Sequence, residues 1–198
     1  MTNAQWDKKL RIRTGGRDDN HADRDHHPYE PTPYSVLERV AAYPFLDHDR
    51  CLIDYGCGKG RAAIMLSALT GCRSIGVEFD PGLCREAERN RLSCPISSRL
   101  RFDCADAETY GVTDADAFYF FNPFSALLLQ GVLRHILDSY YTSPRPMRLF
   151  FYYPSDEYRS LLMTHPELTM LDEIDCRDLF EGSNPRECVL VFAPVGGI

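Results

Sequence analysis

The stretch Cys51-Leu-Ile-Asp-Tyr-Gly-Cys-Gly-Lys-Gly-Arg61 lies at the centre of the predicted organisation of the chain. A short apolar run ends in Asp54, three glycines follow at alternate positions, and a helical pattern runs from Arg61 to Leu69. Glycine has no Cβ and tolerates positive φ, so such a loop can turn tightly and approach a ligand closely. The helix behind it presents free N–H groups. The order strand, glycine loop, helix predicts a nucleoside-binding turn of an α/β protein.

The spacing of the glycines separates several kinds of nucleotide loop. Dinucleotide folds have G-x-G-x-x-G, whereas this chain has D-x-G-x-G-x-G, and its acid would repel a pyrophosphate but suit a cationic amine. A P-loop is excluded because Lys59 is followed by Gly60 rather than by Ser or Thr. The stretch resembles motif I of the class I S-adenosylmethionine (SAM) methyltransferases. The resemblance implies S-adenosyl-L-methionine as cofactor, held by the loop residues Asp54, Gly56, Cys57, Gly58 and Gly60.

Length and composition limit the classes of protein to which the chain can belong. A chain of 198 residues is large enough for one well-packed domain, and its 44% apolar and 26% charged residues are typical of a soluble globular protein. The net charge of −7 argues against a broad nucleic-acid surface, although not against a local basic patch. No apolar run reaches the roughly 18 residues of a membrane span, so we expect a cytoplasmic protein. The eight cysteines include no C-x-x-C pair, so we expect no metal site.

The first 29 residues differ from the rest. Met1 to Arg17 carries five basic residues and one acid, and Asp18 to Glu30 carries five acids with His21, His26 and His27. Because periodicity is nearly absent, we expect a flexible or surface-wrapped arm, with a lid over the active site as the alternative. Solvated histidines are favoured over a metal site. Tyr29, Glu30 and Tyr34 are expected either to face the pocket or to pack under a loop.

Two further strands carry acids expected to contact the cofactor. Arg73–Glu78 is predicted as the second strand, and an acid at its end can accept hydrogen bonds from both ribose hydroxyls. Phe79 is expected to pack on the adenine. After a third strand, Arg99–Asp103, the resemblance assigns an acid to the adenine amino group. Asp106, followed by Ala107, fits that role best, and Asp103 is the alternative acid. Either acid could instead be an ordinary turn residue.

The fourth predicted strand, Asp116–Phe124, ends in Asn122-Pro123-Phe124. This end is similar to a shortened Asn-Pro-Pro-aromatic motif of methyltransferases that act on amino groups. In those enzymes the Asn and a backbone carbonyl hold the acceptor nitrogen and the aromatic ring stacks on a flat group. The resemblance therefore implies Asn122, Pro123 and Phe124 as catalytic residues, with Asn122 also near the cofactor. The alternative is an Asn-Pro turn between strand and helix.

The rest of the chain completes an α/β plan. A helix capped by Ser125, a strand over Arg148–Tyr153 and a short helix are followed by two strands, Leu168–Asp175 and Glu187–Ala193. Because no helix separates these last two, they are expected to form an antiparallel hairpin. The predicted fold is a Rossmann-like three-layer sandwich with a seven-stranded, mostly parallel sheet. Residues 1–29 would form the arm and residues 30–198 the methyltransferase domain.

The resemblance implies a SAM-dependent methyltransferase that transfers a methyl group to a nitrogen of a protein or small-molecule acceptor. Nucleic acid is the less favoured acceptor, and no membrane partner is expected. Asn122 is the favoured acceptor-orienting residue, with Tyr29, Glu30 and Tyr153 as further candidates. Two alternatives remain at this point: a SAM-binding regulatory protein without catalysis, and an NAD-dependent oxidoreductase, against which the loop spacing argues.

Overall fold

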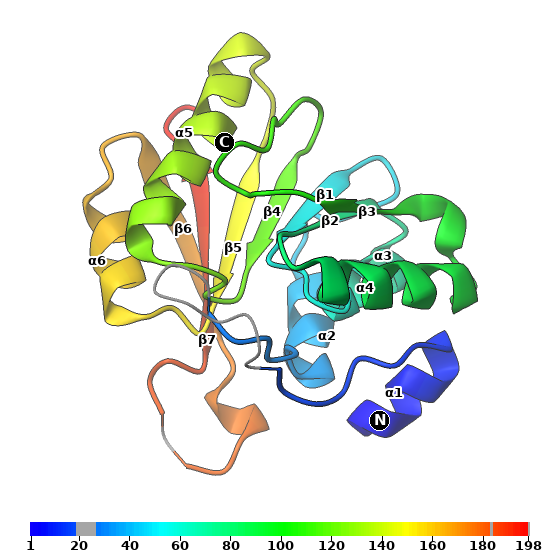
Figure 1. Cartoon of the computed structure of the whole chain (residues 1–198). Coiled ribbons are helices and arrows are strands. Elements are labelled where there is room, and N and C mark those ends of the chain that lie inside the picture. The colour runs from blue at the N-terminus through cyan, green and yellow to red at the C-terminus, as the bar shows by residue number, and fades with distance from the viewer. Residues whose placement is uncertain (19–26, 183, 198) are drawn as a thin grey trace.

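The computed structural model of the chain describes residues 1–18, 27–182 and 184–197. Residues 19–26 of the predicted arm, with His21 and His26, therefore lie outside the described residues. The helices and strands, labelled in Figure 1, follow in this order: α1 (Asn3–Leu10), α2 (Tyr34–Ala42), β1 (Cys51–Tyr55), α3 (Arg61–Thr70), β2 (Arg73–Glu78), α4 (Pro81–Ser93), η1 (Ser97–Arg99), β3 (Leu100–Cys104), β4 (Ala117–Phe120), α5 (Ala126–Thr142), β5 (Arg148–Tyr152), α6 (Asp156–Thr164), β6 (Leu168–Asp175), η2 (Arg177–Leu179) and β7 (Cys188–Pro194). No helix in the described part of the chain has the length and apolar character needed to cross a membrane.

The strands form one seven-stranded sheet in the order β3-β2-β1-β4-β5-β7-β6. The first five strands of the chain pair in parallel, and β7 is antiparallel to both of its neighbours, β5 and β6. The predicted Rossmann-like fold with its C-terminal hairpin is confirmed. The strand order reverses between β1 and β4, and open α/β sheets bind their ligands at the carboxyl ends of the strands at such a point.

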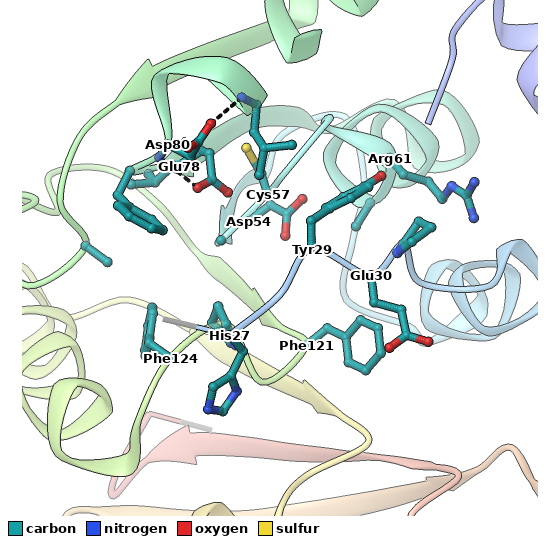
Figure 2. A pocket seen from close by; sticks show the side chains of 18 of the residues that line it. His27, Tyr29, Glu30, Asp54, Cys57, Arg61, Glu78, Asp80, Phe121 and Phe124 are labelled. Carbon is teal, nitrogen blue, oxygen red and sulfur yellow. Dashed lines mark hydrogen bonds between the residues drawn. The ribbon is translucent and has the colours of Figure 1, made fainter. Parts of the chain in front are cut away.

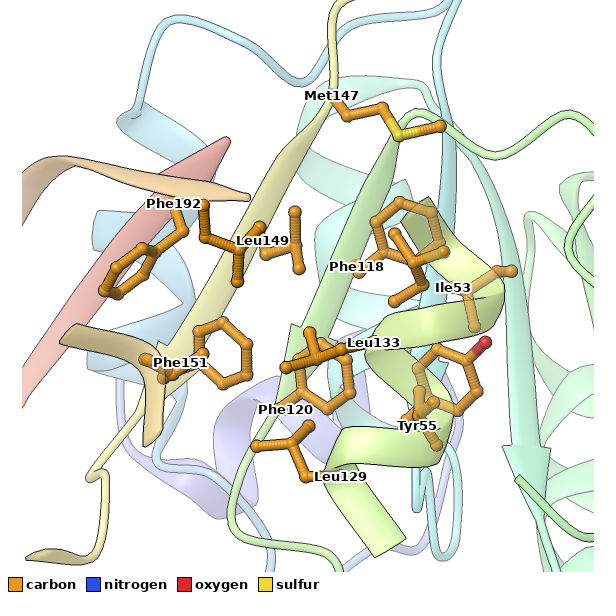
Figure 3. Packing of buried hydrophobic residues seen from close by; sticks show 14 of the residues in the cluster. Ile53, Tyr55, Phe118, Phe120, Leu129, Leu133, Met147, Leu149, Phe151 and Phe192 are labelled. Carbon is orange, nitrogen blue, oxygen red and sulfur yellow. The ribbon is translucent and has the colours of Figure 1, made fainter. Parts of the chain in front are cut away.

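Different helices cover the two faces of the sheet. Side chains alternate along β4: Phe118 and Phe120 join the cluster under α5 and α6, whereas Ala117 and Tyr119 join the cluster under α1, α2 and α3. On the first face the Phe120 ring stacks on Tyr55 and Phe151, with centroid distances of 5.2 and 4.6 Å (Figure 3). The aromatic residues Phe118, Tyr119 and Phe120 therefore belong to the core, and their packing fixes the end of β4.

The expectation of an irregular arm is wrong in part. Residues 3–10 form helix α1, because Thr2 and Gln5 make a reciprocal capping box and Trp6 and Leu10 lie one turn apart and are buried. The expected lack of periodicity is thus wrong for this part of the arm. Helix α2 begins at Tyr34, after Pro33, and no side chain of the described residues caps its N-terminus. The Thr32 hydroxyl is 3.1 Å from the buried Tyr119 hydroxyl.

Candidate functional site

The glycine loop after β1 follows a path that only glycine accommodates easily. Gly56, Gly58 and Gly60 have φ values of 66°, 54° and 85°. A Cβ on Gly56 would lie 2.3 Å from Pro123 Cβ, and one on Gly58 would lie 2.1 Å from Tyr29 Cδ2. The alternate glycines therefore let the end of β4 and the arm close onto the loop.

Asp54 is the second-last residue of β1, a strand that is buried along its whole length, just before this loop. Its side chain is buried, and its Oδ2 accepts a hydrogen bond of 3.0 Å from the Ala63 N–H in α3. Burial raises the pKa of Asp54 to about 7; the Ala63 N–H opposes this rise and the nearby Glu78 carboxyl adds to it. A cation placed beside Asp54 would relieve this burial cost, which suits the ammonium group expected from the sequence.

Glu78, at the end of β2, holds the glycine loop in place through a hydrogen bond. Its Oε2 accepts from the Gly58 N–H at 2.9 Å and its Oε1 accepts from the Asp80 N–H at 3.0 Å. Burial raises the pKa of Glu78, and these backbone donors oppose the shift. A carboxylate oxygen can accept about two hydrogen bonds, so each oxygen keeps capacity for a hydroxyl of a ligand.

These groups line one cavity at the carboxyl ends of β1, β2 and β4 (Figure 2). The cavity brings together most of the residues predicted to bind the cofactor or the acceptor: Asp54, Gly56, Cys57, Glu78, Phe79, Ala107, Pro123 and Phe124. Gly58 is covered by the Tyr29 ring, and Gly60 faces Phe102. Asp106 and Asn122 do not line this cavity.

The acid expected to contact adenine is engaged elsewhere in both alternatives. Asp106 is exposed, and its Oδ1 accepts from the Glu108 N–H at 2.9 Å, as a turn residue does. The Asp103 carboxylate accepts from the Tyr110 hydroxyl at 2.6 Å and pairs with Arg101 at 3.0 Å. Adenine recognition by either acid stays a prediction.

Asn122 joins the end of β4 to the end of β5. Its side-chain nitrogen donates to the Tyr153 carbonyl, and its side-chain oxygen accepts from the Ser155 N–H at 3.2 Å. Asn122 and Tyr153 both have positive φ, at 40° and 51°. The side chain that was expected to orient the acceptor thus stabilises two strained turns, and its catalytic role stays a prediction.

His27 is a site residue that the sequence did not single out. Its backbone N–H donates to the Pro123 carbonyl at 3.1 Å, and its Nδ1 lies 2.7 Å from the Asn122 carbonyl oxygen. A carbonyl only accepts, so Nδ1 donates, and in the neutral ring Nε2 keeps its lone pair. Only its place among the clustered histidines could have pointed to it.

A second cavity, of about 440 Å³, adjoins the first on the side of β5 and η2. His27, Pro28, Glu30, Pro31 and Phe121 line both cavities, so residues 27–31 of the chain lie where the two meet. Asn122, which does not line the first cavity, lines this one. The other residues that line only the second cavity are Arg17, Pro33, Tyr152, Tyr153, Phe180 and Glu187. Of the further candidates, Glu30 and Tyr153 thus belong to this second cavity.

Tyr29 packs the arm onto the glycine loop. Its hydroxyl donates to the Thr14 carbonyl at 2.7 Å, and its backbone pairs with Asp18 through bonds of 3.1 and 2.9 Å. The Lys59 ammonium lies 5.3 Å from the Tyr29 ring centroid. Tyr34, by contrast, is fully buried and directs its hydroxyl to Asp7, outside the cavity.

Known proteins support the same fold. Residues 52–142 match the family described as a methyltransferase domain. An RNA methyltransferase from Salinibacter ruber, solved with S-adenosyl-L-homocysteine, is 21% identical with a TM-score of 0.62, over 83% of this chain and 93% of that one. A TehB-like SAM-dependent methyltransferase from Corynebacterium glutamicum is 17% identical with a TM-score of 0.58, over 81% of this chain and 86% of that one. A geranyl diphosphate C-methyltransferase from Streptomyces coelicolor is 14% identical with a TM-score of 0.57, over 82% of this chain and 77% of that one.

A search of curated protein sequences gave no match. The structural neighbours act on different acceptors, so they support the fold and leave the acceptor open. The fold, the matched domain and the D-x-G-x-G-x-G loop nevertheless agree with one another. The matched domain and the solved structures support a class I SAM-dependent methyltransferase family for this chain, and that family uses S-adenosyl-L-methionine as cofactor.

Proposed function

We propose that the protein transfers a methyl group from SAM to a nitrogen atom of a protein or small-molecule acceptor. The observation that carries this proposal is the convergence of Asp54, the glycine loop and Glu78 on one cavity whose rim contains Pro123 and Phe124. The cytoplasmic location expected from the sequence stays a prediction.

The cavity residues fit the separate parts of the cofactor. Glu78 has oxygen capacity left for two ribose hydroxyls after its bonds to Gly58 and Asp80. Asp54 would pair with the ammonium group, because a buried carboxylate gains most from an opposite charge. Phe79, with 36% exposure, offers a ring face for the adenine.

Bound SAM supplies an electrophilic methyl group, so the protein mainly has to align an uncharged acceptor and remove a proton. Alignment by a fixed site can contribute roughly 7–11 kcal/mol toward lowering a barrier. We assign proton removal to Nε2 of His27, because the Asn122 carbonyl fixes its tautomer and His27 lines both cavities. Asn122 would then act on the reaction through His27 as well as through its own side chain.

The second cavity supports an amine as acceptor. Its aromatic residues, Phe121, Tyr152, Tyr153 and Phe180, provide ring surfaces, and among the described lining residues its two acids, Glu30 and Glu187, outnumber its one arginine, Arg17. The Tyr152 hydroxyl donates to Glu187 Oε2 at 2.8 Å, which holds that carboxylate in place. Carboxylates and aromatic faces attract cationic amines, which can then lose a proton near His27.

The arm is proposed to act as a lid, with residues 1–29 closing over a domain of residues 30–198. The support is that Tyr29 lies directly on Gly58 and that Thr14 receives hydrogen bonds from both Tyr29 and Arg61, the latter at 2.7 Å through Arg61 Nε. Hydrogen exchange of the Gly58 and Tyr29 amides, measured with and without S-adenosyl-L-homocysteine, tests it. Slower exchange with ligand supports a lid, and unchanged exchange contradicts it.

The proposed function is tested by binding and by transfer. Calorimetry should show micromolar binding of SAM and S-adenosyl-L-homocysteine, about −8 kcal/mol, and no binding of NAD. Radiolabelled methyl from SAM should then pass to a member of a panel of amines and basic peptides. Binding without transfer to any acceptor, including nucleic acids and hydroxyl compounds, would favour a regulatory SAM-binding protein.

A further inference from the structure

The basic residues near the N-terminus form a third cavity, outside the two cavities of the methyltransferase site. It is open, about 510 Å³ in volume, and lies between the segment after α1 and the exposed side of α4. Three arginines line it, Arg11, Arg13 and Arg89, together with Glu86, Asn90 and Ser93. The cavity therefore uses part of the basic block of residues 1–17, for which methyl transfer gives no role.

The backbone holds two of these arginines on one side of the segment. Leu10, Ile12 and Thr14 are buried, whereas Arg11 and Arg13 between them are exposed. In such an alternating segment the exposed residues face the same way. Asn90 fixes the position: its Oδ1 accepts from the Arg13 N–H at 2.8 Å and its Nδ2 donates to the Arg13 carbonyl at 3.2 Å.

The same Asn90 also links the cavity to the glycine loop. Its Nδ2 donates to the Lys59 carbonyl at 2.8 Å, and the whole side chain is buried. The Arg13 backbone is therefore anchored to the folded domain rather than to a loose terminus. Arginine side chains mounted on a fixed backbone lose less freedom when they bind a ligand.

The charges around the cavity are not balanced. Glu86, its one acid among the described lining residues, already lies 3.3 Å from Lys59 and 4.0 Å from Arg89. Neither Arg11 nor Arg13 forms an ion pair with an acid of the described chain. This concentration of positive charge is notable in a chain with a net charge of −7. Like charges held together repel one another, and an anion relieves that repulsion.

We propose that this third cavity binds a phosphate group. Guanidinium groups bind phosphate through paired N–H donors, and several arginines converging from two elements match a group with three or more acceptor oxygens. A single carboxylate would leave most of these donors without a partner. The inference is independent of the proposed methyl transfer, because none of the three arginines lines either cavity of that site.

The test compares two variants of the full chain with equal charge. One replaces the cavity arginines, Arg11→Gln with Arg13→Gln, and the control replaces two exposed, ion-paired arginines, Arg177→Gln with Arg186→Gln. Binding of a labelled 12-nucleotide single-stranded RNA is followed by anisotropy across salt concentrations, and binding of inorganic pyrophosphate by calorimetry. Melting curves verify that all variants are folded.

One bound phosphate predicts that the cavity contributes about −0.7 to the slope of log K against log salt in the wild type and in the control. The cavity variant should lose most of this contribution and bind at least tenfold more weakly at low salt. If RNA binds in this way, the phosphate comes from a nucleic acid; if only pyrophosphate does, it comes from a small phosphorylated molecule. Absence of both, or equal losses in the cavity and control variants, overturns the proposal.

Discussion

The Nδ1 atom of His27 donates a hydrogen bond of 2.7 Å to the backbone carbonyl of Asn122, which couples the arm to the end of β4. The backbone N–H of His27 also donates to the adjacent carbonyl, that of Pro123. These two carbonyls therefore each hold a nitrogen of the chain itself at the edge of the proposed acceptor site. The imidazole is left with Nε2 as its proton acceptor.

Replacing His27 tests its proposed role in proton removal. His27→Gln should lower the rate of methyl transfer about a hundredfold near pH 7, because general base catalysis typically contributes that much or more. Affinity for S-adenosyl-L-homocysteine should stay within about twofold.

His48→Gln is the matched control, since the His48 side chain is exposed and lines none of the three cavities. It should leave the rate of methyl transfer unchanged. A wild-type rate in folded His27→Gln would assign proton removal to another group.

Substitutions of Asn122 can distinguish a structural role of this residue from a catalytic one. Asn122→Ala removes the bonds to Tyr153 and Ser155 and places alanine at a φ of 40°, so we expect a loss of about 1–3 kcal/mol in the free energy of unfolding. Asn122→Gly relieves the backbone strain but not the missing bonds, and should recover part of the loss. Urea unfolding of both variants measures this.

Single-turnover transfer on folded Asn122→Ala then decides the catalytic question. If the side chain or its carbonyl positions the reaction, the rate should fall by about a hundredfold, because a displacement of about 1 Å is that costly. A normal rate in a destabilised variant would leave Asn122 a purely structural residue.

Sequence reasoning was sufficient for the elements whose signals are local. β2 and β6 have the predicted boundaries, and Ser125 caps α5 as expected, accepting from the Leu128 N–H at 3.3 Å. Asp54 lies in β1 and Glu78 ends β2, and both line the first cavity, while their binding of the cofactor stays a prediction. Each of these features depends on residues within a few positions of one another.

The remaining features depend on contacts across the chain. His27 reaches its partners through bonds that span 95 residues, which no periodicity in residues 1–30 could indicate. Asn122 lines the second cavity, but its side-chain bonds span 31 and 33 residues to the turn after β5, and the sequence did not indicate these bonds. Helix α1 was missed because Trp6 and Leu10 provide only a two-residue apolar stripe.

The close packing of Tyr29 on Gly58 predicts a coupled effect on stability. Gly58→Ala should cost at least about 1–2 kcal/mol for its positive φ, and more because the new Cβ would overlap the Tyr29 ring. Adding Tyr29→Ala removes the overlap, so the double variant should lose less than the sum of the two single changes. Strict additivity in denaturant unfolding would contradict this contact. Gly15→Ala is the control, since a Cβ there meets nothing within 4 Å.

The raised pKa of Asp54 predicts how cofactor binding depends on pH. In the free protein Asp54 keeps its proton up to about pH 7, above its usual 3.8, whereas an ammonium group binds the ionised form. Affinity for S-adenosyl-L-homocysteine should therefore rise from pH 5.5 to about 7, by at most tenfold per pH unit, and then level off. Asp54→Asn can still accept from Ala63 but cannot ionise, and should lose this rise in calorimetric titrations.

The raised pKa of Asp54 also affects stability: ligand affinity should rise with pH, whereas the contribution of Asp54 to stability should fall. Between about pH 4 and pH 7 the native protein binds the Asp54 proton and the unfolded chain does not. The contribution of this group to the free energy of unfolding therefore falls as pH rises through that window. In the ligand-free protein, Asp54→Asn should lessen that fall; urea unfolding at pH 5 and pH 7 that showed the same fall in both proteins would contradict the assignment.

If the cavity between Asp54 and Glu78 binds SAM, calorimetric titration of S-adenosyl-L-homocysteine should distinguish the wild type from Glu78→Ala. We expect micromolar binding to the wild type and a loss of about 1.5–3 kcal/mol in Glu78→Ala, because two charge-assisted hydrogen bonds to the ribose are lost. Glu181→Ala, an exposed acid on the β6–β7 connection, should bind like the wild type. Wild-type affinity in a folded Glu78→Ala variant, or no binding to the wild-type protein, would contradict the account.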